Sequence, residues 1–269
     1  MPKITNYGKL NIDPSYDRNT HLLKAIKSTR IALEKKLEDI DKITNPTMQL
    51  ICMFSLLDCL AQEEAKYPVS FKKAFCQFVL KHQKQCDYLE QVDPVTLYYH
   101  VEEIIDETAP SPDVPPEKEL NLKPLEYMDG KLVKEVVYSD KANEILDYIA
   151  KKKDRDFADE KKQEHQLIYL IYRMRSKAVH EMSGLGEDIY SFEDFAKDEP
   201  FYLDIGRNYV LDGDLMGDDV LKLIIPNIFI RNILQDCVYG YLNECEDKKR
   251  FPFENNHMTR KHILSWYDK

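Results

Sequence analysis

The segment Met48–Glu64, MQLICMFSLLDCLAQEE, constrains the fold most, because it is apolar on most sides of a helix. A helix of that kind is buried by its neighbours, so the segment predicts a central helix. Asn45 and Pro46 precede it as an N-cap and a proline suited to the first turn. Asp58 interrupts the apolar run, where an unpartnered carboxylate is costly. We expect Asp58 either to bond to a neighbouring helix or to be a surface acid.

Amphipathic spacing predicts further helices along the chain. They cover residues 18–42, a segment around 71–79, 94 to about 107, 140 to about 153, 156–181 and 227 to about 245. A small β element is expected before the last helix, with a hairpin of residues 201–205 and 208–211 around Gly206-Arg207 and a strand at 220–225. Only 8 glycines occur in 269 residues, which argues against all-β and glycine-rich nucleotide folds. The predicted fold class is therefore mainly α.

The segment 108–124 differs from the rest, because five of the 13 prolines of the chain fall within it. Proline is excluded from helix interiors, so this segment is interpreted as a loop or an insert. The helices on either side are too partial to stand alone. We therefore expect a single domain over residues 1–269, with this insert and with the β element plus helix at about 200–245.

Composition limits the compartment and the partners. The net charge of −10 makes the chain a poor general coat for nucleic acid, although it leaves room for a local basic site. No apolar run reaches the roughly 18–20 residues of a membrane span, and the first residues lack the apolar core of a signal peptide. The six cysteines form no CxxC pair and indicate reduced, buried thiols. We expect a cytoplasmic protein with no membrane partner. No phosphate loop, HExxH helix, zinc spacing or EF-hand loop occurs, so no cofactor and no metal are expected.

The candidate chemistry lies in the segment 167–186, LIYLIYRMRSKAVHEMSGLG, which holds Arg175, Ser176 and His180 near the end of a helix. A histidine can move a proton between the oxygens of an RNA phosphodiester, and an arginine can stabilise the charge on the phosphorane. Ser176 is four residues before His180 and could orient its imidazole. Arg175 and His180 are about 140° apart around a helix, so one copy makes an incomplete site. A homodimer would complete it.

The flanking residues suggest how RNA would be held. Between Lys151 and Lys177 nine basic residues oppose five acidic ones, a local balance of 9 − 5 = +4. We predict that Arg173 and Lys177 contact phosphates and that Tyr172 stacks on a base. The open alternatives are a solvated helix face for the charges and core or dimer packing for the stripe of His165, Tyr169, Tyr172, Ser176 and His180. The Arg-x4-His spacing alone also fits a surface arginine and a histidine favoured by the helix dipole.

The string LIYRMRSKAVHEMSG resembles the signature of the HEPN superfamily, in which a helix rich in aliphatic residues and tyrosine leads into Arg-polar-x-x-x-His. FSLLDCLAQ, with Asp58, resembles the helix that packs against it, and LIIPNIFIRNILQDC resembles the strand and helix that often follow. The resemblance implies a HEPN-like helical bundle and a homodimer. It also implies metal-independent RNA cleavage that leaves a cyclic phosphate, with Arg175 and His180 as the catalytic pair and Ser176 as the polar second position.

Family analogy adds an expected role in microbial defence or as a toxin, with an antitoxin or regulatory partner. A second hypothesis keeps the same fold and dimer but no cleavage, so that the protein is a nucleotide- or RNA-binding module or a scaffold. Ser176, where many active members carry Asn, Asp or His, and Glu181, where Gly is common, favour this alternative.

Overall fold

The computed structural model describes residues 17–65, 69–84, 87–106, 128–136, 141–181, 189–190, 197–204, 207–211, 214–218 and 221–254. Within these residues the chain is mainly helical, with a small β element in the C-terminal third, as the sequence predicts. The expected insert at 108–124 lies outside the described residues. None of the described helices is long and apolar enough to cross a membrane.

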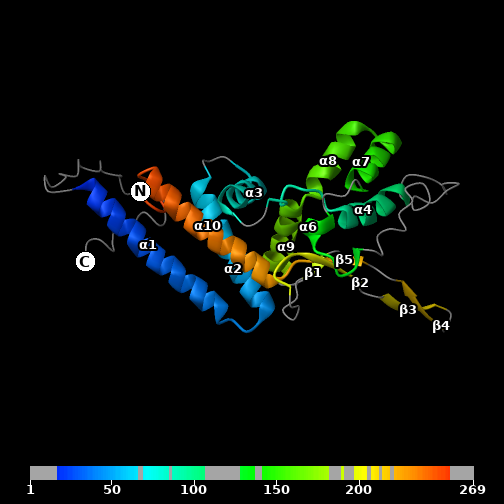
Figure 1. Ribbon diagram of the computed structural model, residues 1–269, viewed down its shortest axis with the longest axis horizontal. Coiled ribbons are helices and arrows are strands. Elements are labelled where there is room, and N and C mark those ends of the chain that lie inside the picture. Colours follow the sequence, from blue (N-terminus) through cyan, green and yellow to red (C-terminus); the bar gives the residue numbers. More distant parts are fainter. Residues whose placement is uncertain are drawn as a thin grey trace, which may run out of the picture.

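Four helices form a long bundle, seen at the left of Figure 1: α1 (Arg18–Asp41), α2 (Pro46–Glu64), α3 (Phe71–His82) and α10 (Asn227–Asp247). Helix α10 packs against each of the other three. The predicted central helix is confirmed, because α2 buries Leu50, Met53, Phe54, Leu57 and Leu60 completely. Its N-cap is also as expected, since the Asn45 side chain accepts from the backbone N–H of Met48 at 2.9 Å.

A second group of helices has its own smaller core. It consists of α4 (Pro94–Asp106), α7 (Lys141–Lys152) and α8 (Arg155–Glu164). Their apolar contacts gather Leu97, Ile145 and Ile149 away from the main cluster. A single turn, α6 (Val133–Val136), precedes α7. Figure 1 shows α9 (Leu167–Glu181) between this group and the long bundle, and α9 contacts α2, α3 and α8.

The prediction of one helix over residues 156–181 is wrong, because the chain breaks at His165 and Gln166 between α8 and α9. The cause is a backbone pairing with the segment before α4. The N–H groups of Leu167 and Ile168 donate to the carbonyls of Gln91 and Leu89 at 3.0 and 2.9 Å. The N–H of Asp93 donates to the carbonyl of His165 at 2.8 Å. These bonds replace the intrahelical ones that a continuous helix would make.

The strand at 220–225 is confirmed as β5 (Leu221–Ile224), but the predicted hairpin is wrong. Strand β2 (Phe201–Asp204) pairs antiparallel with β5, and β1 (Ile189–Tyr190) pairs with its other edge. Strand β3 (Arg207–Leu211) pairs instead with β4 (Asp214–Asp218). Burial explains the choice, since Phe201 and Tyr202 are buried and β5 is buried along its whole length, which places β2 in the core beside β5.

Five cysteines lie in the described residues and all are free thiols. Cys76, Cys237 and Cys245 are buried in the main core, as expected of reduced cysteines. Cys59 is exposed, which the sequence pattern did not predict. It lies on α2 beside Asp58, where that helix reaches the surface.

Candidate functional site

Arg175 on α9 is held by Asp58 on α2. The guanidinium Nε and Nη2 both donate to Oδ2 of Asp58, at 2.6 and 2.5 Å. The two side chains retain only 10% and 15% of their accessible surface. The carboxylate of Asp58, which lies in an apolar helix, therefore has a charged partner. Of the two predicted alternatives, Asp58 is the buried partner of a neighbouring helix and not a surface acid.

Tyr172 lies one turn before Arg175 and packs against the same side of the bundle. Its ring centroid is 5.5 Å from that of Phe75 on α3, and the Arg175 guanidinium carbon lies 5.6 Å from the centre of the Tyr172 ring. Burial raises the pKa of the Tyr172 hydroxyl, and the Asp58 carboxylate adds to the increase while Arg175 opposes it. Tyr172, one member of the predicted stripe on α9, therefore packs against the bundle and also supports Arg175.

The other predicted site residues occupy different environments on α9. Arg173 is exposed, whereas Ser176 and Lys177 are half-buried. His180 belongs to the last turn of α9, and its side chain lies outside the described residues. The structure thus brings Arg175 together with Tyr172, and places Arg173 and Lys177 one turn apart along the same helix.

His165 does not continue the predicted stripe, because it lies in the break between α8 and α9. Its ring is buried, and Nδ1 lies 3.1 Å from the hydroxyl of Thr96 on α4. The His100 ring, also on α4, lies 5.2 Å away between centroids. Burial, followed by the nearby His100, Arg173 and Lys161, lowers the pKa of His165 to about 3. This residue is therefore a neutral imidazole at pH 7.

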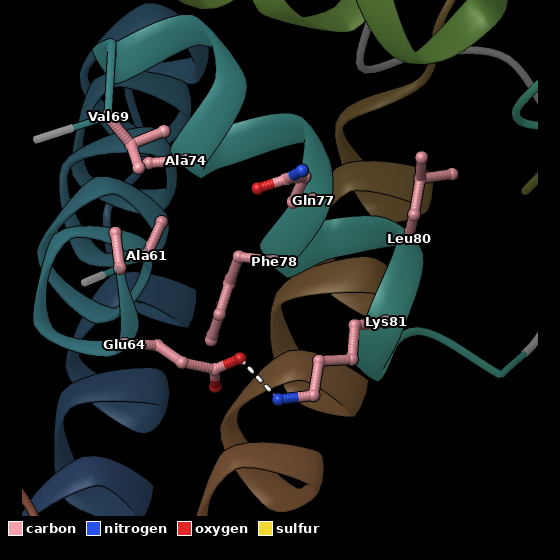
Figure 2. Close-up of a pocket in the computed structure, with 9 residues that line it drawn as sticks. Ala61, Glu64, Val69, Ala74, Gln77, Phe78, Leu80 and Lys81 are labelled. Atoms are coloured by element: carbon pink, nitrogen blue, oxygen red, sulfur yellow. Dashed lines mark hydrogen bonds and ion pairs between the residues drawn. The ribbon is translucent and has the colours of Figure 1, made fainter. Parts of the chain in front are cut away.

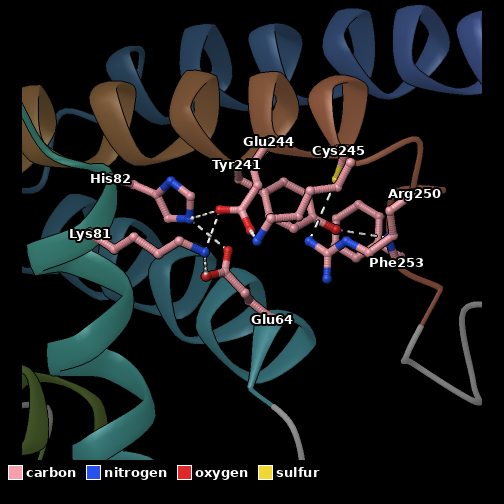
Figure 3. A network of polar contacts seen from close by, with 9 residues as sticks. Glu64, Lys81, His82, Tyr241, Glu244, Cys245, Arg250 and Phe253 are labelled. Carbon is pink, nitrogen blue, oxygen red and sulfur yellow. Dashed lines mark hydrogen bonds and ion pairs between the residues drawn. The ribbon is translucent and has the colours of Figure 1, made fainter.

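The motif search missed an ion-pair network that joins α2, α3 and α10, drawn in Figure 3. Lys81 binds Glu64 at 2.5 Å and also binds Glu244, while His82 Nε2 lies 2.6 Å from Glu64. Although burial raises the pKa of Glu244, hydrogen bonds from Lys248 and Lys81 lower it to about 2. No sequence motif could reveal this network, because its members are dispersed over three helices.

A depression of about 640 Å³ lies between α2 and α3, shown in Figure 2. Small side chains, among them Ala61, Ala65 and Ala74, leave the space between the two helices. Glu64 and Lys81, which belong to the ion-pair network, lie at one end. None of the predicted site residues lines it.

Comparisons of this chain with protein-family models, with curated proteins and with solved structures find no match. The expectation of a HEPN-like protein therefore rests on the residues of the chain itself.

Proposed function

We propose that this protein is a metal-independent endoribonuclease of the HEPN type, active as a homodimer. His180 would act as the general acid and base, Arg175 would stabilise the charge that develops on the phosphate, and Ser176 would orient His180. The observation that carries the proposal is the Asp58–Arg175 pair. Two nitrogens of the Arg175 guanidinium donate to Asp58 and fix its position on α9. A group that stabilises a transition state has to be held in position before the reaction begins.

The RNA would lie along the surface of α9. Arg173 is exposed there and Lys177 follows one turn later, so both can meet phosphates without uncovering the core. Tyr172 packs against Phe75 and would support Arg175 more than it stacks on bases. Because Arg175 and His180 project about 140° apart from one helix, each site would be completed by α9 of the second protomer.

The location and the biological role belong to the same proposal. Metal-free RNA cleavage in the cytoplasm suits a toxin or a microbial defence protein. Such an enzyme needs restraint by an antitoxin or a regulatory partner. Only the family resemblance supports this role, since fold and chemistry do not determine it.

A second candidate, a non-cleaving HEPN-like RNA-binding or scaffold protein, is favoured by one observation. Arg175 exposes only 8% of its surface, and its donors face Asp58. A guanidinium so placed suits a buried structural pair as well as a catalytic group. The two functions share the fold and the dimer and differ in cleavage.

The test is RNA cleavage in EDTA by the wild type, His180→Ala and His21→Ala, with mixed tRNA, ribosomal RNA and messenger RNA as substrates. His21 lies on α1 and makes a matched control histidine. The proposal expects cleavage by the wild type and by His21→Ala, products with a cyclic phosphate, and a loss of at least about 100-fold in His180→Ala, the typical contribution of acid–base catalysis. A wild type that binds these RNAs without cutting them supports the scaffold instead. Equal cleavage by all three proteins would exclude His180 as the catalytic base.

A further inference from the structure

We infer that His100, Glu164 and His165 form a binding site for a divalent transition-metal ion, best matched by Zn²⁺. One nitrogen of each imidazole and one carboxylate oxygen of Glu164 all lie within 4.8 Å of one another. Two imidazoles and one carboxylate are a donor set that zinc accepts in proteins, with the fourth position left to water. This inference is independent of the proposed ribonuclease chemistry, which uses no metal.

The ligands come together because of the break between α8 and α9. Glu164 ends α8 and His165 follows it, while His100 lies on α4. The backbone bond from Asp93 N–H to the carbonyl of His165 fixes the start of α4 against this junction. The site would therefore join α4 to the connection that leads into α9.

The protonation state of His165 suits a metal ligand. Thr96 donates its backbone N–H to Oδ2 of the buried Asp93 at 2.7 Å, and its hydroxyl also hydrogen bonds to that carboxyl group. The Thr96 oxygen is then the acceptor for Nδ1–H of His165 at 3.1 Å. This order of donors leaves the Nε2 lone pair for an ion. A histidine ligand oriented through its other nitrogen is the usual arrangement around zinc.

The geometry requires only small movements to close around an ion. Zinc bonds of about 2.1 Å in a tetrahedron place ligand atoms about 3.4 Å apart. Atoms within 4.8 Å reach that spacing by side-chain shifts of about 1 Å. Glu164 and His100 are half-buried, so an ion can enter from solvent. Lys161 binds Oε2 of Glu164 at 2.7 Å, and this carboxylate has a second oxygen to offer.

The only other group of this kind among the described residues, formed by Glu64, His82 and Glu244, is less suited to a metal. The Lys81 ammonium already bonds to both carboxylates, so an ion would have to displace a cation. Figure 3 shows Lys81 between Glu64 and Glu244. This group therefore serves as an internal control for the test.

The experiment titrates the metal-free full-length protein with Zn²⁺ in competition with a chromophoric chelator, and repeats the titration with Co²⁺ to record its visible absorption. The inference expects one equivalent per chain and a four- or five-coordinate cobalt spectrum. Glu164→Gln and His100→Ala change half-buried side chains, so the fold should persist. Each should weaken zinc binding by more than tenfold. Thr96→Val removes the hydroxyl that supports His165 and that also bonds to Asp93, and it should weaken zinc binding by about 10- to 100-fold.

Two matched variants decide the outcome. Glu160→Gln changes an exposed glutamate one turn earlier on α8 and should bind zinc like the wild type. Glu244→Gln alters the competing cluster and should also leave zinc binding unchanged. The inference is overturned if the wild type binds no zinc, if Glu164→Gln and Glu160→Gln bind equally, or if the loss follows Glu244→Gln. None of these outcomes bears on RNA cleavage in EDTA, so the two proposals fail separately.

Discussion

Removing one partner of the Asp58–Arg175 pair should destabilise the protein strongly. In Asp58→Leu the guanidinium of Arg175 stays inside the bundle without its carboxylate. Breaking a buried pair costs about 3–5 kcal/mol. Because the two side chains keep 10% and 15% of their exposure, we expect the lower end, about 3 kcal/mol. For a chain of this size that corresponds to a fall in Tm of about 6–12 °C.

The double variant Asp58→Leu/Arg175→Met separates burial from charge. It replaces both ions by apolar side chains of similar volume, which is often neutral or stabilising. We therefore expect it to recover most of the stability lost in Asp58→Leu. Urea unfolding followed by circular dichroism gives the free energy of unfolding for the wild type, the two single variants and the double variant, and the four values close a double-mutant cycle.

Two results would refute this reasoning. If Asp58→Leu costs less than about 1 kcal/mol, the pair behaves like an exposed salt bridge and does not hold α9. If the costs of the single variants simply add in the double variant, the two side chains are not coupled. The double variant also bears on function, because a folded protein without Arg175 should no longer cleave RNA if that guanidinium stabilises the transition state.

Three further predictions follow from the packing. In metal-free protein, the free energy of unfolding should fall as pH drops from about 6.5 towards 3, because the unfolded state then binds a proton that buried His165 does not bind in the folded state. The loss is about 2 kcal/mol at pH 5. Urea unfolding of His165→Gln should lack this part of the pH dependence. Gly240→Ala should destabilise the protein by about 1–2 kcal/mol despite the better helix propensity of alanine, since the new Cβ would lie 2.8 Å from Nδ1 of His82. An unchanged Tm in thermal melts would show that this contact relaxes freely. The carboxylate of Glu244 should contribute stability above pH 4.5 that disappears as pH falls towards 2. In Lys248→Ala the NMR titration midpoint of Glu244 should rise. An unchanged midpoint would contradict the hydrogen bond between Lys248 and Glu244.

Much of the helical framework could be predicted from local pattern. The apolar run predicts a central helix, which α2 is, and of the two environments considered for Asp58 the structure shows the bond to a neighbouring helix. Caps and prolines placed the starts of α2 and α4 correctly, because these signals act within a few residues. Local periodicity, however, says nothing about backbone partners far along the chain.

The helix break and the ligand cluster involve such distant partners, and the misplaced hairpin does so in part. The break at His165 depends on carbonyls of Leu89 and Gln91, which no periodicity around residue 165 reveals. The predicted hairpin is misplaced because β2 pairs with β5. Asp212-Gly213, which separates β3 from β4 in the sequence, is the stronger turn signal in that region and agrees with the hairpin that forms. The cluster proposed to bind zinc has no sequence motif for the same reason, since only the fold brings His100 on α4 to Glu164 and His165 at the junction of α8 and α9.

The position of α10 has a consequence for synthesis on the ribosome. This helix covers α1, α2 and α3, yet it is made long after them, and the pair between Arg231 and Asp41 spans 190 residues of sequence. At about 5–20 residues per second, the earlier helices wait roughly 10–40 s for their cover. During that interval the apolar faces of the first helices are open to chaperones and to other nascent chains. The protein's yield in the cell should therefore depend on chaperone supply more than its final stability suggests.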